Sequence, residues 1–476
     1  MTHLVTTTAR LPRFERIASL VAIGVNVLIV GWLFVVAAIG FEGRPPESRL
    51  RRFFTAQAEA ILSGRLSVSF ADGADECFVS NGLCYGYFGL TPSLLRIPFM
   101  GFAGGSGMTD FFVFAGLVLG IVGSIVLVNV IYRGLASGID AAPDRRLARL
   151  AYIGALTVAG PGNFYVALTL PTGYEEAIIF GSTFATWGIV TLVLWLRTGE
   201  TRWLGWATVA FVLGANTRPS VIPISIAAAL AITVFVAVGW RNRKNSVAVW
   251  WALAMGALPI GTSVSVWYAK FGVLLPPLAI NEWVMKTDRW KNIMAANGGH
   301  DSWWGFIPTN LVQYFRPDSL FWNDGFLKAV RPKFADVLIL PPLDGNGIFV
   351  SPMASVTALV PAVVLLVAAA VWKTPRLASA MSAGKPMPRL VSVGLALVGW
   401  SAMGLLAINV GLQNRYMGDL IPAITISAAL GSAAIGCDPT ISPRLRRVLV
   451  YGFVALACAG IAVSVAHQVW QISRYT

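Results

Sequence analysis

Long apolar runs follow one another along this chain of 476 residues, and they exclude most soluble folds. Each run is about 20 residues long, enough to cross the hydrocarbon core of a bilayer as an α-helix. Only 12% of the residues are charged, against about 25% in a soluble chain of ordinary composition. We therefore predict an all-α polytopic membrane protein with about 11 transmembrane helices. The predicted spans lie near residues 17–40, 108–131, 150–170, 177–196, 204–215, 247–268, 353–372 and 448–465, and further spans end near residues 240, 410 and 436.

The positive charge of the chain is concentrated in short gaps between these runs. Lys and Arg number 36 against 22 Asp and Glu, for a formal net charge of +14. Arg10, Arg13 and Arg16 precede the first run, and basic clusters recur at alternate gaps. This alternation follows the positive-inside rule, so it predicts a cytoplasmic N-terminus rather than a nucleic-acid partner. The first run is too long for a typical signal peptide and is predicted to be an uncleaved anchor.

The predicted topology makes residues 1–476 a single membrane domain with two long extracytoplasmic loops, at residues 41–107 and 269–350. Acidic, basic and aromatic residues gather in these loops and in the short turns on the same side. A charge at the centre of a bilayer costs about 2.5–3.5 kcal/mol on insertion scales. The gathering of charges on one side therefore predicts a shared cavity that faces the outer surface.

Three carboxylates stand close together in the first loop, within the stretch DGADECFVSNGLCYGYFGLTPSLLRIP that begins at Asp72. They are Asp72, Asp75 and Glu76. A carboxylate in a cavity can act as general base on an acceptor hydroxyl, a role typically worth about 10²–10⁴ in rate. The alternative is a solvated loop acid or a helix N-cap.

Two local structures are predicted in the same loop. Cys77 and Cys84 flank a short Ser-Asn-Gly turn and would form a disulfide outside the cytoplasm; the alternative is two free thiols. Upstream, apolar residues at helical spacing around Phe54 predict an amphipathic helix that ends near Gly64. We expect this helix to lie along the membrane surface.

Further polar residues on the predicted outer side fall into two groups. Basic side chains at span ends suit a lipid phosphate, with interfacial snorkelling as the alternative; they are Arg218, Arg415 and Lys270. Polar and acidic side chains suit sugar or acceptor hydroxyls; they are Tyr174, Glu175, Glu176, Tyr416 and Asp419. Glu175 and Glu176 could also hold the catalytic loop, and the structural alternative for both is a favourable interaction with the dipole of the following helix. A divalent cation between carboxylates is a further alternative.

The chain resembles the GT-C superfamily of polytopic membrane glycosyltransferases. The pieces that carry the resemblance are AEAILSGRLSV, ECFVSNGLCYGYFGLTPSLLRIP, GNFYVALTLPTGYEEA, GANTRPS, WYAKFG and NRYMGDLIP, and they are spread over most of the chain in the order typical of such proteins. The resemblance is of an actinobacterial type. It implies a role in building cell-envelope or cell-wall glycans at the bacterial cytoplasmic (inner) membrane.

The resemblance also implies a reaction. The donor would be a polyprenyl-phosphate-linked monosaccharide, and the acceptor a glycan, lipid or protein on the extracytoplasmic side. An acid of the first loop would be the catalytic base in an inverting mechanism. Glu76 matches that position best, with Asp75 adjacent, although many relatives have Asp where Glu76 stands. Basic residues near the outer surface would hold the lipid phosphate, which fits Arg218 and Arg415. No cofactor is implied with certainty.

Two alternatives come from other classes. A lipid-linked sugar flippase or another transporter would require charges or broken helices midway through the spans. A non-catalytic subunit of envelope assembly would tolerate replacement of the loop acids.

Overall fold

The structure is a computed structural model and describes residues 13–40, 52–73, 77–101, 105–135, 142–160, 173–239, 245–274, 307, 320–323, 326–329, 388–408 and 418–473. Helices dominate this part of the chain. Six of them are long and apolar enough to cross a membrane: α1 (Arg13–Gly40), α5 (Gly105–Leu135), α8 (Gly173–Thr198), α11 (Asn245–Phe271), α17 (Ile421–Cys437) and α18 (Pro443–Ser473). The prediction of a mostly helical membrane protein is confirmed.

Shorter helices correspond to several of the remaining predicted spans. They are α6 (Arg145–Ala159), α9 (Arg202–Ala215), α10 (Val221–Gly239), α15 (Pro388–Trp400) and α16 (Met403–Ile408). The predicted ninth span corresponds to α15 and α16, which a turn at Ser401 and Ala402 separates. The predicted eighth span, at 353–372, lies outside the described residues.

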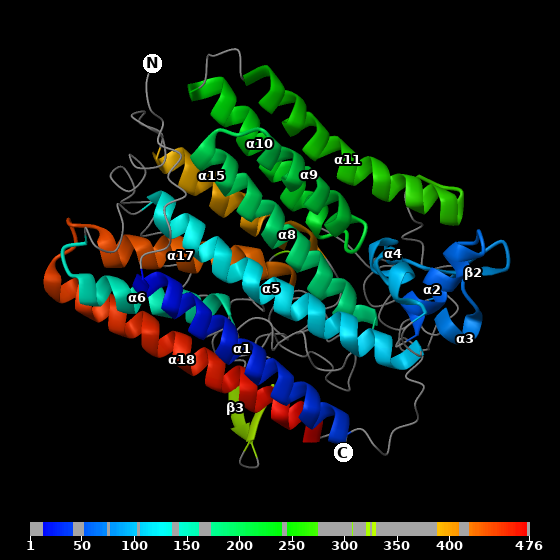
Figure 1. The fold of residues 1–476 in the computed structure, drawn as a ribbon, viewed down its shortest axis with the longest axis horizontal. Coiled ribbons are helices and arrows are strands. Elements are labelled where there is room, and N and C mark those ends of the chain that lie inside the picture. Colours follow the sequence, from blue (N-terminus) through cyan, green and yellow to red (C-terminus); the bar gives the residue numbers. More distant parts are fainter. Residues whose placement is uncertain are drawn as a thin grey trace.

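Helix α17 is the centre of the bundle (Figure 1). All its residues from Ile421 to Gly436 are buried, and it packs against α5, α6, α8, α15 and α18. Its sequence is rich in Ala, Ser and Gly, which allow helix backbones to approach closely. A Cβ on Gly436 would lie 3.2 Å from the Cα of Ala148 in α6. Helices α1 and α18 lie side by side at the periphery.

Residues 52–73 and 77–101, here together called the loop segment, form a small layer at one end of the bundle (Figure 1). The loop segment contains α2 (Phe53–Leu62), α3 (Phe70–Gly73), β1 (Cys77–Ser80), β2 (Leu83–Gly86), α4 (Thr91–Arg96) and the 3₁₀ helix η3 (Ile97–Phe99). We call this end of the bundle the loop end; α5 and α8 begin there and α11 ends there. The opposite end, where α1 and α18 begin and α5 ends, is called the basic end.

The two strands of the loop segment form a tight antiparallel hairpin, in which Val79 pairs with Cys84. Asn81 and Gly82 occupy the turn with φ values of 53° and 73°. Two consecutive residues at positive φ suit the right-handed twist of a hairpin, and Asn-Gly is the pair that adopts them most readily. The Ser-Asn-Gly segment is therefore a turn, as predicted.

Helix α2 forms where the apolar spacing predicts it, and Gly64 follows it with a φ of 72°. Seven of its residues, including Gln57, are buried by protein. The rings of Phe53, Phe54 and Phe88 pack with centroids 5.2–5.5 Å apart and form the core of the loop segment. The apolar face of the helix is therefore covered by protein, and its position along the membrane surface stays a prediction.

Within the second long loop the structure describes a second hairpin, which consists of β3 (Leu320–Asn323) and β4 (Phe326–Ala329). Most of the predicted loop at 269–350 lies outside the described residues.

Candidate functional site

Arg96, at the end of α4, carries a charge into the interface between the loop segment and the membrane helices. Its guanidinium forms a two-pronged ion pair with Glu176 in the first turn of α8. The Nη2 atom donates to Glu176 Oε2 at 2.5 Å, and Nη1 donates to Oε1. Both side chains have 0% exposure. Parallel donors on a planar guanidinium match the two oxygens of a carboxylate, so this contact fixes orientation as well as distance.

Neighbouring groups occupy the rest of the Arg96 guanidinium. Nε lies 3.3 Å from Thr55 Oγ1 in α2, and Nη2 lies 3.1 Å from Thr109 Oγ1 in α5. The guanidinium carbon lies 4.7 Å from the ring centroid of Phe112. One side chain therefore connects α2, α4, α5 and α8. A second buried contact, from Ser93 Oγ to Gln57 Oε1 at 2.7 Å, holds α4 on α2.

Lys270 lies in the last turn of α11 and reaches the other side of the loop segment. Its Nζ donates to the backbone oxygens of Gly86 at 3.0 Å and Phe88 at 2.6 Å. The side chain is 3% exposed, and among the described residues no carboxylate pairs with it. Lys270 thus holds the chain immediately after the hairpin, where backbone carbonyls would otherwise lack donors.

Arg218 stands at the turn between α9 and α10 and is held by a distant acid. Its Nε lies 2.7 Å from Asp419 Oδ1 and 2.8 Å from Oδ2. Ser220 Oγ donates to the same carboxylate at 2.8 Å. Asp419 is 3% exposed and Arg218 is 9% exposed, so the ion pair is nearly removed from solvent. It connects the start of α10 to the residues just before α17.

The loop segment and the Arg218 turn are in direct backbone contact. The amide of Thr91 donates to the carbonyl oxygen of Asn216 at 3.1 Å. Gly89 makes this approach possible, because a Cβ on it would lie 1.7 Å from that oxygen. The motifs YGYFGLTP and ANTRPS, separated by more than 100 residues, therefore meet at the loop end.

The predicted site residues have different outcomes. The structure places Glu176, Arg218, Lys270 and Asp419 at the loop end; Arg218 and Asp419 contact each other, while Glu176 and Lys270 have other partners. Glu175 is buried, as is Glu176. Arg415 and Tyr416 lie outside the described residues, and of Tyr174 only the backbone, in α8, is described.

Of the three predicted catalytic acids, Asp72 is the one within the described residues; Asp75 and Glu76 lie outside them. The carboxylate of Asp72 accepts a hydrogen bond from Ser69 Oγ at 2.6 Å, and its amide donates back to that hydroxyl at 3.1 Å. This reciprocal pair caps the start of the short helix α3. Asp72 therefore contributes to this local structure as the third residue of α3, whereas Ser69 is the N-cap residue.

The cysteines are partly described. Cys84 is disulfide-bonded, and Cys437 and Cys458 are free. The side chain of Cys77 lies outside the described part, so the pairing of Cys77 with Cys84 stays a prediction. Within the described ranges, no three His, Cys, Asp or Glu residues come together in a way that could hold a metal ion.

Sequence reasoning missed Arg96, which is the most connected charge at the loop end. A signal was present, because Arg96 interrupts the apolar stretch SLLRIP. A charge in such a stretch requires a buried partner. The sequence offers several acids that could serve, and the fold selects Glu176.

No family model and no curated protein matches the chain. Among solved structures, the chain is similar to the crystal structure of the Archaeoglobus fulgidus oligosaccharyltransferase in the apo form, with a TM-score of 0.48 and 16% sequence identity. The match covers 93% of this chain and 56% of that chain, so this chain spans just over half the length of the protein it matches.

Proposed function

We propose that this chain is a membrane glycosyltransferase that moves a monosaccharide from a polyprenyl phosphate to a glycan, lipid or protein acceptor outside the cytoplasmic membrane. The observation that carries the proposal is the assembly at the loop end. Residues from the loop segment, α8, α11 and the starts of α10 and α17 bring buried acids and bases into one layer of the protein.

The position of the charges favours an enzyme over a transporter. In the described helices with defined side chains, Asp, Glu, Lys and Arg lie in the turns near the helix ends, as Glu176 in α8 and Lys270 in α11 illustrate. A transporter that alternates its access would need charges or broken helices midway through the spans, and the described helices meet the second criterion at the turn between α15 and α16 but not the first. The central helix α17 has no charged residue between Ile421 and Cys437.

The proposed chemistry is a single displacement at the anomeric carbon. Glu76, or else Asp75 or Asp72, takes the proton of the acceptor hydroxyl while its oxygen attacks that carbon. The bond between the anomeric carbon and the phosphate oxygen breaks with inversion, and its electron pair leaves with the polyprenyl phosphate as an ionised group. The proton finishes on the carboxylate, so atoms and charge balance.

We assign the binding of the donor phosphate and of the acceptor to residues at or near the loop end. Arg218 and Arg415 contact the phosphate of the donor, and Asp419 orients the Arg218 guanidinium in addition to any contact with the acceptor. Lys270 acts on the phosphate or, through its contacts with Gly86 and Phe88, on the loop segment. Tyr174, Glu175 and Tyr416 keep the predicted acceptor-binding role. Glu176 is fully buried with both carboxylate oxygens on Arg96, so it holds the loop segment on α8 instead.

The test is sugar transfer by the purified full chain from a panel of polyprenyl-phosphate sugars. We expect Glu76→Gln to abolish transfer, with Asp75→Asn and Asp72→Asn as the competing candidates. Glu59→Gln is the matched control, because Glu59 is a half-exposed acid of the same loop segment that pairs with Arg52 at 3.6 Å. Addition of EDTA tests whether a divalent cation takes part.

The outcomes separate the three classes of function. Loss of transfer in one carboxamide variant that keeps the elution profile of the wild type identifies the base. Transfer unchanged in all three variants removes this loop as the catalytic centre. If no donor supports transfer but lipid-linked sugar crosses liposomes that contain the protein, the chain is a flippase. If neither occurs and the loop acids are dispensable in cells, the chain is a non-catalytic assembly subunit.

A further inference from the structure

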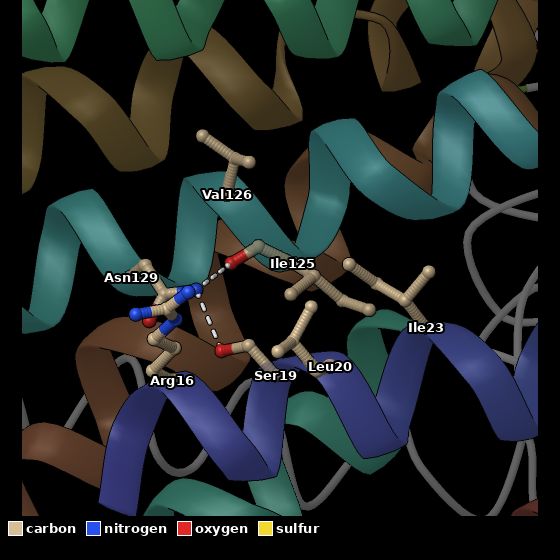
Figure 2. A pocket seen from close by; sticks show the side chains of 7 residues that line it. All are labelled: Arg16, Ser19, Leu20, Ile23, Ile125, Val126 and Asn129. Atoms are coloured by element: carbon tan, nitrogen blue, oxygen red, sulfur yellow. Dashed lines mark hydrogen bonds between the residues drawn. The ribbon is translucent and has the colours of Figure 1, made fainter. Parts of the chain in front are cut away.

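A pocket of about 370 Å³ lies between α1 and α5 near the basic end, far from the proposed active site (Figure 2). Leu20 and Ile23 of α1 and Ile125 and Val126 of α5 form its apolar part. Arg16, Ser19 and Asn129 form its polar end. None of these residues contributes to the loop end.

The side chains of Ser19 and Asn129, which line the pocket, form hydrogen bonds with other groups of the protein. Asn129 Nδ2 donates to Ser19 Oγ at 3.0 Å and to the carbonyl oxygen of Ile125 at 2.9 Å (Figure 2). Tyr152 Oη of α6 donates to Asn129 Oδ1 at 2.5 Å. Because these atoms already have partners within the protein, the pocket wall offers a ligand mainly apolar surface.

Arg16 is different, because it is exposed and stands at the polar end of the pocket. The adjacent acid Glu15 faces another partner, with its carboxylate 3.7 Å from Arg133 Nε. Among the described residues no carboxylate pairs with Arg16. Arg13 is also exposed, and the guanidinium of Arg149 lies 4.9 Å from the ring centroid of Phe14. This corner of the basic end therefore carries an excess of positive charge.

The pocket opens on an apolar and largely exposed surface of α1. In the apolar 18-residue stretch of α1, only 22% is buried within the protein, against 94% in the corresponding stretch of α17. Leu20, which lines the pocket, is 59% exposed. An apolar groove in such a surface, with a cation at the level of the helix end, matches an acyl chain joined to an anionic headgroup.

We propose that the α1–α5 pocket binds an anionic glycerophospholipid of the membrane leaflet at the basic end, with its phosphate at Arg16 and one acyl chain against Leu20, Ile23 and Val126. The bound lipid would fill the outer side of the contact between α1 and α5. This proposal is independent of the sugar-transfer reaction.

The experiment is native mass spectrometry of the full chain, exchanged from detergent into equal mixtures of phosphatidylglycerol and phosphatidylcholine. Each Lys or Arg near an anionic surface contributes enough attraction for a preference of about fivefold. We expect phosphatidylglycerol to be retained about fivefold over phosphatidylcholine. Arg16→Gln should remove this preference, and Arg16→Lys should keep it, which separates loss of charge from loss of fold.

Two controls match the two parts of the site. Arg447→Gln removes an exposed arginine of α18 that does not line the pocket, and it should leave the preference unchanged. Leu20→Trp should fill the pocket and lower lipid retention, whereas Val21→Trp, at a residue 57% exposed on the same helix but outside the pocket, should not.

Several results would overturn the proposal. They are equal retention of both lipids by the wild type, equal effects of Arg16→Gln and Arg447→Gln, or equal effects of Leu20→Trp and Val21→Trp. A dimer that Leu20→Trp abolishes would assign the pocket to a second copy of the chain instead.

Discussion

The buried ion pair between Arg96 and Glu176 makes a quantitative prediction about stability. Glu176→Gln keeps the shape of the side chain but removes its charge, so it leaves a guanidinium with 0% exposure and no counter-charge from this partner. Removing one partner of a buried pair typically costs about 3–5 kcal/mol, because the remaining charge stays desolvated. The other hydrogen-bond partners of Arg96 are the hydroxyls of Thr55 and Thr109 and the carbonyl oxygen of Pro92, which are neutral and cannot replace a carboxylate.

This cost can be converted into a shift of the unfolding midpoint. An unfolding entropy of about 2.1 cal/mol/K per residue gives about 1 kcal/mol/K for a chain of 476 residues that unfolds as one unit. Glu176→Gln should therefore lower the apparent midpoint by about 3–5 °C. The assay is thermal unfolding in detergent, followed by size-exclusion chromatography with tryptophan fluorescence.

The chain supplies a matched control. Arg52 and Glu59 form an ion pair at 3.6 Å in the same loop segment, but their side chains are 53% and 51% exposed. An exposed pair contributes about 0.2–1 kcal/mol, so Glu59→Gln should move the midpoint by less than about 1 °C. The double variant Arg96→Met, Glu176→Leu should lose less stability than the single variants Arg96→Met and Glu176→Leu lose in sum, because it leaves no unpaired charge behind.

The result that would refute the reasoning is a Glu176→Gln midpoint within about 1 °C of the wild type, like that of the exposed control. In that case the contact seen in the structure would not hold the loop segment on the membrane helices. Additive effects in the double variant would likewise show that the two side chains are not coupled.

Three further predictions concern the same layer. Gly89→Ala should lower the unfolding midpoint, because overpacking should destabilise the chain by about 1–3 kcal/mol or more. Gly101→Ala is the control, because no atom lies within 4 Å of its added Cβ. Equal midpoints for the two variants would contradict the close approach of Gly89 to Asn216. Lys270→Met should raise the hydrogen-exchange rate of the backbone amides after the hairpin about tenfold or more, because the buried carbonyls of Gly86 and Phe88 lose their donor. An unchanged exchange rate would show that other donors hold these carbonyls. Denatured, unreduced protein should show two thiols reactive to iodoacetamide and four after reduction; four before reduction would exclude the disulfide of Cys84.

Local features of the sequence determined much of the fold. The apolar runs predict α1, α5, α8, α11, α17 and α18, because a lipid environment requires long apolar helices whose backbone is satisfied internally. Asn81 and Gly82 predict the hairpin, since they adopt positive φ readily. Gly64 marks the end of α2 for the same reason. The position of the charges near the helix ends follows from the cost of placing them at the bilayer centre.

Only the tertiary structure decided which charges meet. Arg96 and Glu176 are 80 residues apart, and Arg218 and Asp419 are 201 apart, so no local pattern pairs them. The tertiary structure also decided that α2 is buried by protein. The sequence alone could not decide this, because an apolar helix face can pack against lipid or against other side chains equally well. Composition and spacing thus select the elements of this protein, while the partners of its buried charges depend on how the helices pack.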